Sequence, residues 1–472
     1  MHIVHYFFIF ILSIILYNPL LSGESNASQL NWIGHWKGAD KRQQLIEEIK
    51  REYEFIYPDV KVNLRYNEDL DAPGATYKWK AANTIVRMIK TGNIDWDIIY
   101  LGVTVYHHVS ELLGDPNWGE KHLVDFNTIP SFPATQKNFI NTNPWYKQQT
   151  GGILVGPMIE GFILCLWYNP QVARKIGIKV KERNMTTEDF ISYARATSEY
   201  NKKNKAAIPF VKLGIWNRMA YLFEYLFKSQ FVDPKFAIEE KFDQRKLQPF
   251  LDTLRIFEQL AAYQPFFNRN WRKLSWNEWE TDFLDDDGLF IVAGTFMYSH
   301  FRGKNPEKAQ KLIPVEFPYV HRPNGLVGDY INTFAVMKRS PNRDRAVDML
   351  MLWAEPKVAE EWVEYTMNPT GLKGNICDPV TASLDRADVY GSFLSDMTKK
   401  YGKMPMRYFR VPTYVFGIDC PVNKTEFHEK LACILEGKIT AQEYYDELYR
   451  RFQKKRKKRH QTMIGKHPPH EE

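Results

Sequence analysis

Cysteine is scarce in this chain, which has four in 472 residues and no C-x-x-C pair. This scarcity excludes a disulfide-rich scaffold and the common zinc motifs. The sequence also lacks the G-x-S-x-G, H-E-x-x-H, G-x-x-x-x-G-K and G-x-G-x-x-G signatures, which mark common hydrolases, metallopeptidases and nucleotide-binding proteins. These absences indicate a protein that is not an enzyme, and no cofactor or metal is expected.

Charge of one sign is not in large excess either. Lys and Arg total 63 against 56 Asp and Glu, and six of the cations form a single run at 454–459. Because the rest of the chain is close to neutral, a body that binds nucleic acid is not indicated. We expect 454–472 to be a basic, disordered tail. The alternative is that the run touches anionic headgroups, at about 1 kcal/mol per cation.

Long apolar runs are absent except for one at 7–16. This run is too short to cross a bilayer, which takes about 20 apolar residues, and it is typical of a secretory signal peptide. Ser25 and Ala27 supply the small residues of a cleavage site, so 1–27 is predicted to be removed. An uncleaved anchor is the alternative. No cysteine follows 21–23, where a lipoprotein would carry one, so we expect a periplasmic or secreted protein that is not a lipoprotein.

An exported protein folds in an oxidising compartment, which makes a disulfide among the C-terminal cysteines plausible. Cys377, Cys420 and Cys433 are the possible partners, and the sequence does not decide which two would pair. Cys165 lies in the apolar segment 163–167 and is expected to be a buried, small hydrophobic residue.

What the chain does have is a high aromatic content, 15%, and an alternation of short apolar strands with amphipathic helices. Strands are expected over 30–33, 60–64 and 96–101, with helices from Asp40 and over 79–90 between them. Strands separated by helices predict parallel pairing in an open α/β sheet. Further helices are expected from Thr186, over 250–262, over 344–353 and from Pro356, and further strands over 289–293 and 331–337.

Three conspicuous groups of residues favour a structural interpretation. His107 and His108 are adjacent and do not share a helix face, which makes a poor metal site. The acidic run 285–287 is followed by glycine and resembles a solvated turn more than a calcium site. Three tryptophans are spaced for helix packing, namely Trp271, Trp276 and Trp279.

A series of short motifs occurs in the order found in one known family. They are Trp32-Ile33 with the turn and helix that follow, 57–62 (YPDVKV), 91–99 (TGNIDWDII), 156–169, 176–178 (IGI), 185–190 (MTTEDF), 328–336 (GDYINTFAV), 340–346 (SPNRDRA) and 435–440 (LEGKIT). By these motifs, which span about 30–450, the chain resembles extracellular solute-binding proteins of family 1, the maltose-binding-protein-like receptors of ABC importers. It departs from the family pattern by lacking the Trp of 185–190 and the lipoprotein Cys, and by having Pro170 in place of a Lys, which leaves the subfamily undecided.

The resemblance implies an α/β, two-lobed fold of the periplasmic-binding-protein type II class. Each lobe would be a mostly parallel sheet flanked by helices, and crossing hinge strands would join the lobes. The N-terminal lobe is predicted to comprise 28–162 and 335–370, and the C-terminal lobe 163–334 and 371–453. A ligand held at the interface would close the two lobes by a hinge motion.

Candidate ligand-binding residues follow from the rule that ligands of open α/β sheets lie beyond the carboxyl ends of the strands. Trp36, Glu160, Asp329 and Tyr330 are the first choices, and Glu160 stands where the resembled maltose receptor has a sugar-binding glutamate. The remaining candidates are His35, Lys37, Tyr100, Thr104, Thr295, Phe296, Tyr298, Trp216 and Asn217. Each could instead be a structural residue, because aromatic side chains are more often partly buried in a core.

The resemblance implies that the protein captures a carbohydrate, which we expect to be an oligosaccharide. It would then deliver this ligand to the membrane permease of an ABC importer. The aromatic content suits it, because aromatic rings pack against the flat faces of sugars. We expect a monomer that does not bind nucleic acid. Three alternatives stay open: the same fold binding a polyamine, ferric ion or oxyanion, a ligand sensor for a membrane signalling protein, and a secreted enzyme.

Overall fold

The structure, a computed structural model, describes residues 28–38, 40–72, 79–132, 152–157, 160–215, 218–323, 327–331, 333–366, 368 and 411–465. The predicted signal peptide, Cys377, Trp216 and Asn217 lie outside the described residues.

The N-terminal lobe is built on a four-stranded sheet. Its strands are β1 (Ser28–Gly34), β2 (Val60–Tyr66), β3 (Ile98–Tyr100) and β8 (Phe334–Val336), in the order β2-β1-β3-β8. β1 is parallel to β2 and β3, and Trp32 lies opposite Leu64 on one side and Ile98 on the other. β8 comes from much later in the chain and closes the sheet antiparallel to β3.

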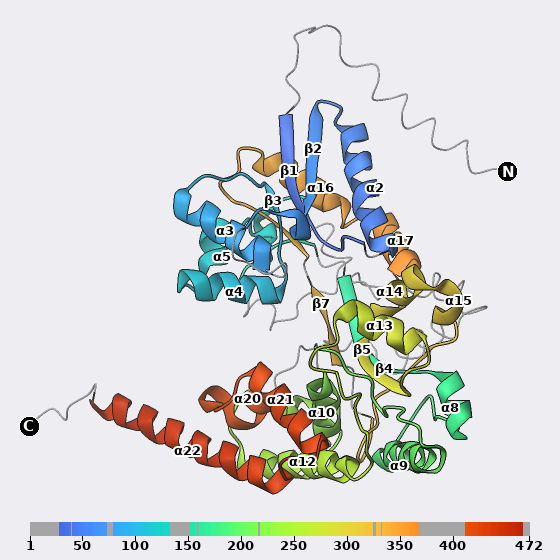
Figure 1. The fold of residues 1–472 in the computed structure, drawn as a ribbon. Helices are drawn as coiled ribbons and strands as arrows, with labels where there is room; N and C mark the ends of the chain where they lie inside the picture. Colours follow the sequence, from blue (N-terminus) through green and yellow to red (C-terminus); the bar gives the residue numbers. More distant parts are fainter. Residues whose placement is uncertain are drawn as a thin grey trace, which may run out of the picture.

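Helices cover both faces of this sheet, with α2 on one side and α3 and α4 on the other (Figure 1). The apolar residues at helical spacing in α2, Leu45, Ile49 and Tyr53, are all buried. Gly92 ends α3 in the left-handed conformation that glycine adopts without strain. The helices of this lobe are α2 (Asp40–Ile56), α3 (Lys80–Thr91), α4 (Val103–Leu113), α5 (Trp118–His122), α16 (Arg343–Leu352) and α17 (Pro356–Thr366), with 3-10 turns η1 (Asn67–Asp69) and η3 (Phe126–Thr128).

The C-terminal lobe is organised around one long strand, β4 (Glu160–Tyr168). β5 (Phe290–Gly294) and β6 (Ile313–Val315) flank it, and β7 (Val327–Ile331) pairs with its first half. All three are antiparallel to β4, because β4 runs into this lobe from the junction while its partners run back. The mostly parallel sheet expected here is therefore found only in the N-terminal lobe, and parallel pairing within the described part of this lobe is limited to isolated bridges such as Val211 to Phe290.

The C-terminal lobe is richer in helices, as the sequence predicts. α9 begins with the expected capping box, in which Thr186 and Asp189 each accept from the other's backbone N–H. The helices are α8 (Pro170–Ile176), α9 (Thr187–Asn204), α10 (Met219–Lys228), α11 (Pro234–Ala237), α12 (Leu247–Ala261), α13 (Trp276–Leu284), α14 (Met297–Lys304), α15 (Pro306–Ala309), α20 (Val411–Phe416), α21 (Lys424–Leu435) and α22 (Ala441–Gly465), with 3-10 turns η4 (Gln244–Lys246) and η5 (Gly417–Asp419).

Each lobe has its own hydrophobic core. The core of the N-terminal lobe includes Trp32, Ile85 and Trp353, and the main core of the C-terminal lobe includes Phe223 and Phe427. The lobes also touch, because α14 packs against both α2 and α17, and these helices lie near the middle of the molecule in Figure 1. The exact points at which the chain passes from lobe to lobe stay a prediction.

The strand expected over 331–337 is broken in two. β7 ends at Ile331 and β8 begins at Phe334, because β7 pairs with β4 in one sheet and β8 pairs with β3 in the other. Asp329 and Tyr330, expected to precede the strand, therefore lie inside β7 with their backbones opposite Phe162 and Gly161.

The basic tail was expected to be disordered from 454, and this expectation is wrong over 454–465. α22 continues through the basic run to Gly465, since Lys and Arg are good helix formers. Contacts with the body also hold it, for Lys455 Nζ donates to the carbonyl oxygen of Cys420 at 2.9 Å and Arg459 pairs with Asp419 at 2.9 Å.

The described cysteines are all free thiols. Cys420 and Cys433 form no disulfide, and Cys420 Sγ instead donates to the carbonyl oxygen of Val422 at 3.3 Å. The disulfide considered for the C-terminal cysteines is therefore absent at these two residues. Cys165 is buried, as expected.

Candidate ligand-binding site

Trp36 follows β1 closely and packs into the core of the N-terminal lobe. Its side chain is 6% exposed, and its ring centre lies 5.2 Å from that of Trp362 and 5.9 Å from that of Phe334. The backbone φ at Trp36 is 69°, a conformation that costs a non-glycine residue about 1–3 kcal/mol. Packing around the ring holds this conformation, so Trp36 has a structural role whatever else it does.

His35 and Tyr100 stack on each other at the ends of neighbouring strands. Their ring centres are 3.9 Å apart and the rings are inclined by 14°. Burial, and then the charge of Arg42, lowers the pKa of His35 to about 3, so the imidazole is neutral at pH 7. Nδ1 of His35 is buried without a hydrogen-bond partner among the described residues. This buried nitrogen therefore keeps a hydrogen-bonding capacity that the described residues do not satisfy.

Arg42, in the first turn of α2, brings positive charge to this junction. Its side chain is buried, and its guanidinium carbon lies 5.6 Å from the ring centre of Trp36 and 5.5 Å from that of Trp362, within cation–π distance. Its charge lowers the pKa of His35 in the N-terminal lobe and of His300 in the C-terminal lobe. Groups from both lobes therefore share one electrostatic environment.

Glu160 is buried at the start of β4, where several strand ends meet. Thr333 Oγ1 donates to Glu160 Oε2 at 2.6 Å, and the carbonyl oxygen of Thr333 accepts from Leu101 N at 2.7 Å. Burial raises the pKa of Glu160, although the Arg42 charge and the Thr333 hydrogen bond oppose this. The carboxyl group therefore belongs to the junction between β3, β4 and β8.

Thr295 also holds the junction. It is fully buried, and its Oγ1 accepts from Ile163 N at 3.1 Å and donates to Asn368 Oδ1 at 2.8 Å. These bonds join the end of β5 to β4 and to a third segment of the chain. Tyr298 is likewise buried, at 5% exposure in α14.

Two aromatic rings and a guanidinium group lie together in the C-terminal lobe near the junction. They belong to Trp276, Phe296 and Arg218, and we call these three residues the Trp276 cluster. The ring centres of Trp276 and Phe296 are 6.4 Å apart, with the rings inclined by 28°. The guanidinium carbon of Arg218 lies 5.2 Å from the first ring centre and 5.0 Å from the second. Such a combination can pack against a flat apolar face and bind a polar group beside it.

A buried acid with two partners adjoins the Trp276 cluster. Glu280 Oε1 lies 3.5 Å from His300 Nδ1, and Oε2 lies 3.6 Å from Lys304 Nζ. Burial raises the pKa of Glu280 to about 7 against the opposing charge of Lys304. Burial, followed by the charge of Arg42 and other cations, lowers the pKa of His300 to about 3. Near pH 7 this group therefore offers a neutral imidazole and a carboxyl group close to half protonation.

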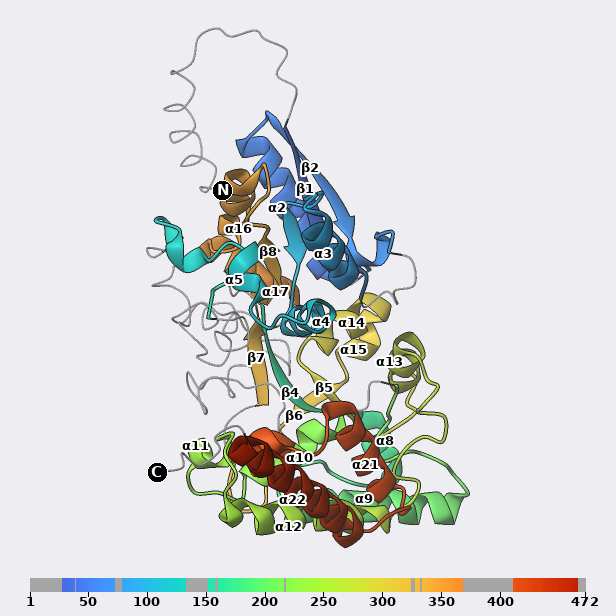
Figure 2. The same ribbon diagram turned by 90° about the vertical axis from the view of Figure 1, so that its left-hand side faces the viewer.

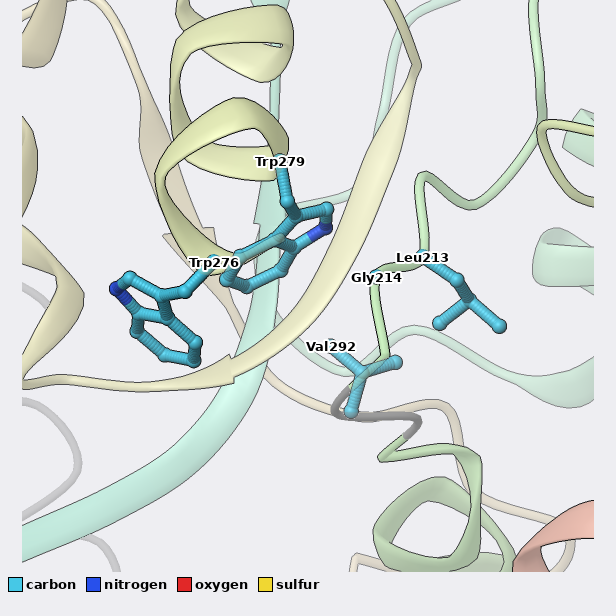
Figure 3. Close-up of a pocket in the computed structure, with 5 residues that line it drawn as sticks. All are labelled: Leu213, Gly214, Trp276, Trp279 and Val292. Atoms are coloured by element: carbon cyan, nitrogen blue, oxygen red, sulfur yellow. The ribbon is translucent and has the colours of Figure 1, made fainter. Parts of the chain in front are cut away.

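A small hollow lies beside the Trp276 cluster (Figure 3). Its volume is about 10 Å³, at the lower limit for one water molecule, so a sugar ring could enter only if the surrounding side chains moved. The lining residues are Leu213, Gly214, Trp276, Trp279 and Val292.

The predicted site residues fall into four groups. His35, Trp36, Tyr100 and Glu160 gather at the junction, with Thr295, Phe296 and Tyr298 on the opposing lobe. Lys37 instead lies at the surface and pairs with Asp69 at 2.5 Å. Thr104 and the pair Asp329 and Tyr330 are described by their backbones alone, in α4 and β7, and Trp216 and Asn217 lie outside the described residues.

Sequence reasoning missed five polar or aromatic residues of this region, namely Arg42, Arg218, Trp276, Glu280 and His300. His300 follows the candidate Phe296 by four residues, a helical spacing that could have identified it. Arg42 lies in the first turn of α2, five residues after Lys37, the last candidate that follows β1. Trp276 was interpreted as structural because its spacing within α13 matches helix packing.

The acidic run 285–287 is an ion-paired turn, in agreement with the structural interpretation. Lys212 pairs with Asp287 and Lys308 with Asp285. Within the described ranges no group of three or more His, Cys, Asp or Glu side chains is placed to hold a metal ion. Nor is any helix of the described part long and apolar enough to span a membrane.

Comparison with known proteins gives matches at the level of structure. No protein-family model matches the chain, and no curated relative matches by sequence. Among solved structures, the GacH receptor of Streptomyces glaucescens, solved unliganded and with acarbose, is 14% identical, with 90% of this chain and 98% of that chain covered and a TM-score of 0.61.

Two further solved structures are similar to the same degree. Maltose-bound MalE3 of T. maritima is 13% identical, covering 90% of this chain and 99% of that chain at a TM-score of 0.60. RafE of Streptococcus pneumoniae is 14% identical, covering 92% and 100% at a TM-score of 0.59. At these identities the likeness is one of fold, and it confirms that the chain has the two-lobed α/β fold of the sugar-binding solute-binding proteins that its motifs resemble.

Proposed function

We propose that this chain is an exported solute-binding protein that captures an oligosaccharide between its two lobes and delivers it to an ABC importer. One observation carries the proposal. Aromatic rings and neutral or charged hydrogen-bonding groups lie together on both sides of the junction between the lobes. The fold supports it, since the structural neighbours include proteins solved with acarbose and with maltose.

The chemistry of a sugar fits the groups on both sides of the junction. A pyranose has flat C–H faces, which pack on aromatic rings such as those of Trp276 and Phe296. Its hydroxyls both donate and accept, and the neutral imidazoles of His35 and His300 can do the same. A carboxyl group such as that of Glu160 can accept from a hydroxyl pair.

The charge of the junction disfavours a polyamine. A polyamine needs ionised carboxylates around it, whereas burial raises the pKa of both Glu160 and Glu280. Arg42 and Lys304 add positive charge nearby, which would repel a cationic ligand. A neutral or acidic saccharide meets no such penalty.

The test of ligand class is a thermal-shift screen of residues 28–472 against oligosaccharides, spermidine, ferric ion and oxyanions. A ligand at 100 times its Kd should raise the unfolding free energy by about 2.7 kcal/mol. We expect a shift with an oligosaccharide, loss of that shift in Glu160→Gln and Trp276→Ala, and recovery of the bound sugar without turnover. Phe55→Ala is the matched control, because Phe55 is 80% exposed in α2. A shift with spermidine, ferric ion or an oxyanion alone would contradict the choice of sugar.

Location and transport need separate measurements. Mass spectrometry of the exported protein should give Ser28 as the first residue if the predicted signal peptide is cleaved. Uptake of the labelled sugar should be lost in cells without this chain and restored by the wild-type chain. Normal uptake with loss of a sugar-dependent transcriptional response would instead identify a sensor.

A further inference from the structure

The end of α22 carries a group of positive charges that is separate from the residues described at the junction between the lobes. Residues 453–459 are all exposed. This part of the helix projects from the lobe in Figure 1 and turns toward the viewer in Figure 2. The apolar residues that hold α22 to the body, Tyr444, Leu448 and Phe452, all precede the basic run. The helix therefore continues beyond the core that stabilises it.

Three cations of the run face the body and are engaged there. Lys455 donates to a backbone carbonyl oxygen at 2.9 Å, and Arg459 pairs with the buried Asp419 at 2.9 Å. The guanidinium carbon of Arg456 lies 5.3 Å from the ring centre of Phe242. At about 100° per residue, these three lie along one arc of the helix.

The opposite arc carries Arg450, Lys454, Lys457 and Lys458 by the same helical geometry; we call these four residues the outer basic face. All four are exposed, and among the described residues Arg450, Lys454 and Lys457 have no ion pair. The nearest acid on this arc is Asp446, one helical turn before Arg450, and no acidic residue occurs from 448 to 465, so the three lysines of this face have no acidic residue within one turn on their own helix.

We propose that the outer basic face docks the protein onto the surface of an anionic phospholipid membrane. A straight, protruding helix with its cations along one arc is complementary to a flat, negatively charged surface. Each cation near such a surface strengthens binding about five-fold, the equivalent of about 1 kcal/mol. The rest of the chain is close to neutral, so docking through this face would orient the protein on the membrane.

The choice of a membrane over a nucleic acid rests on the exported location in the proposed function. An exported receptor without a lipid anchor gains local concentration if it is held near its importer. α22 packs against α12, and Figure 1 places α12 and the start of α22 at the end of the C-terminal lobe away from the N-terminal lobe. Docking through α22 would therefore leave the junction between the lobes accessible.

The test is co-sedimentation of full-length mature protein with phosphatidylcholine vesicles, with and without phosphatidylglycerol. We expect binding only with phosphatidylglycerol, release at high salt, and about 100-fold weaker binding when Arg450, Lys454 and Lys457 are all changed to Gln. The matched control changes Lys175, Lys202 and Lys203 to Gln, which removes the same charge from exposed positions of α8 and α9. Circular dichroism melts of both variants check that they are folded, and the wild-type salt dependence is a second readout.

Each other outcome counts against the proposal. Equal binding to both kinds of vesicle, no binding to either, or equal weakening by the control variant would overturn it. Tighter binding to a DNA duplex, lost in the same triple variant, would assign the face to nucleic acid instead. The sugar-dependent thermal shift should be unchanged in the triple variant, so failure of docking and failure of sugar binding are separate results.

Discussion

At the scale of single residues, the junction between the lobes is held by buried polar groups whose partners are distant in the chain. Glu160 and Thr333 are 173 positions apart and share a 2.6 Å hydrogen bond. Thr295 and Asn368 are 73 positions apart and share one of 2.8 Å. A buried acceptor that loses its donor keeps its cost of desolvation, so each residue depends on its partner.

Thr333→Val should lower the free energy of unfolding by about 1–3 kcal/mol, because it removes the donor to the buried Glu160 carboxyl group and leaves the shape similar. Urea denaturation followed by circular dichroism measures this. Thr91→Val is the matched control, since Thr91 is exposed at the end of α3 and should change stability by less than about 0.5 kcal/mol. Equal losses in the two variants would argue against a special role for the Glu160 bond.

His35 should make the protein less stable in acid. Its pKa is about 3 in the folded protein against 6.5 for the ordinary group, so below pH 6.5 the unfolded chain binds a proton that the folded chain does not. At pH 5 this lowers stability by about 2 kcal/mol relative to pH 7. Glu280 acts in the opposite direction, because its pKa is raised to about 7 and the folded state binds the extra proton.

Between pH 7 and pH 5, the free energy of unfolding of His35→Gln should therefore fall by about 2 kcal/mol less than that of the wild type. The measurement is urea unfolding at both values of pH. His321→Gln, at an exposed histidine, is the control and should follow the wild type. If His35→Gln also follows the wild type, the imidazole is protonated in the folded state and could not stay neutral for a ligand.

At the scale of elements, the two sides of α22 should respond differently to the loss of a cation. Arg459→Gln leaves the carboxylate of Asp419, which is 5% exposed, without its ion pair and should cost about 1–3 kcal/mol. Lys457→Gln removes an exposed cation and should stay within about 0.5 kcal/mol of the wild type. Thermal and urea unfolding compare the two variants. Equal effects would mean that the contacts of α22 with the body contribute little.

The elements themselves were largely predictable from the sequence. Apolar spacing located α2 and α12, and the capping pattern located the start of α9, because these signals are local. The break between β7 and β8 was not predictable, since it depends on which sheet each half joins. The helical end of α22 was missed because its support comes from Asp419 and Cys420, whose proximity the sequence does not reveal.

The candidate site was predictable in part. The strand-end rule led to His35, Tyr100, Glu160 and Phe296, which do gather at one junction. The rule could not find Arg218 or Trp276, since the approach of Trp276 to Phe296 depends on how α13 packs against α14, and that of Arg218 on where α10 begins. Whether these residues bind a ligand stays a prediction.

At the scale of the whole molecule, the two cores are formed by different parts of the chain. We therefore expect two steps in urea unfolding without ligand, since domains with separate cores need not unfold together. Leu45→Ala in the N-terminal core and Leu254→Ala in the C-terminal core, both fully buried, should each cost about 2–5 kcal/mol and shift different steps. Tryptophan fluorescence and circular dichroism would follow the steps. A single transition shifted alike by both variants would show that the lobes unfold as one unit.

The pairing of β4 with β7 determines how such a molecule can move. The two strands lie side by side from Glu160 to Leu164 and from Val327 to Ile331, so a chain that passes between the lobes here, as we predict, forms a hydrogen-bonded ribbon rather than a single flexible connection. A two-stranded ribbon bends and twists across its face far more easily than it shears within its plane, because shear would break the ladder. We therefore expect any opening to be confined to nearly one coordinate, so that a single distance between labels on the two lobes would report the conformational state of the whole protein.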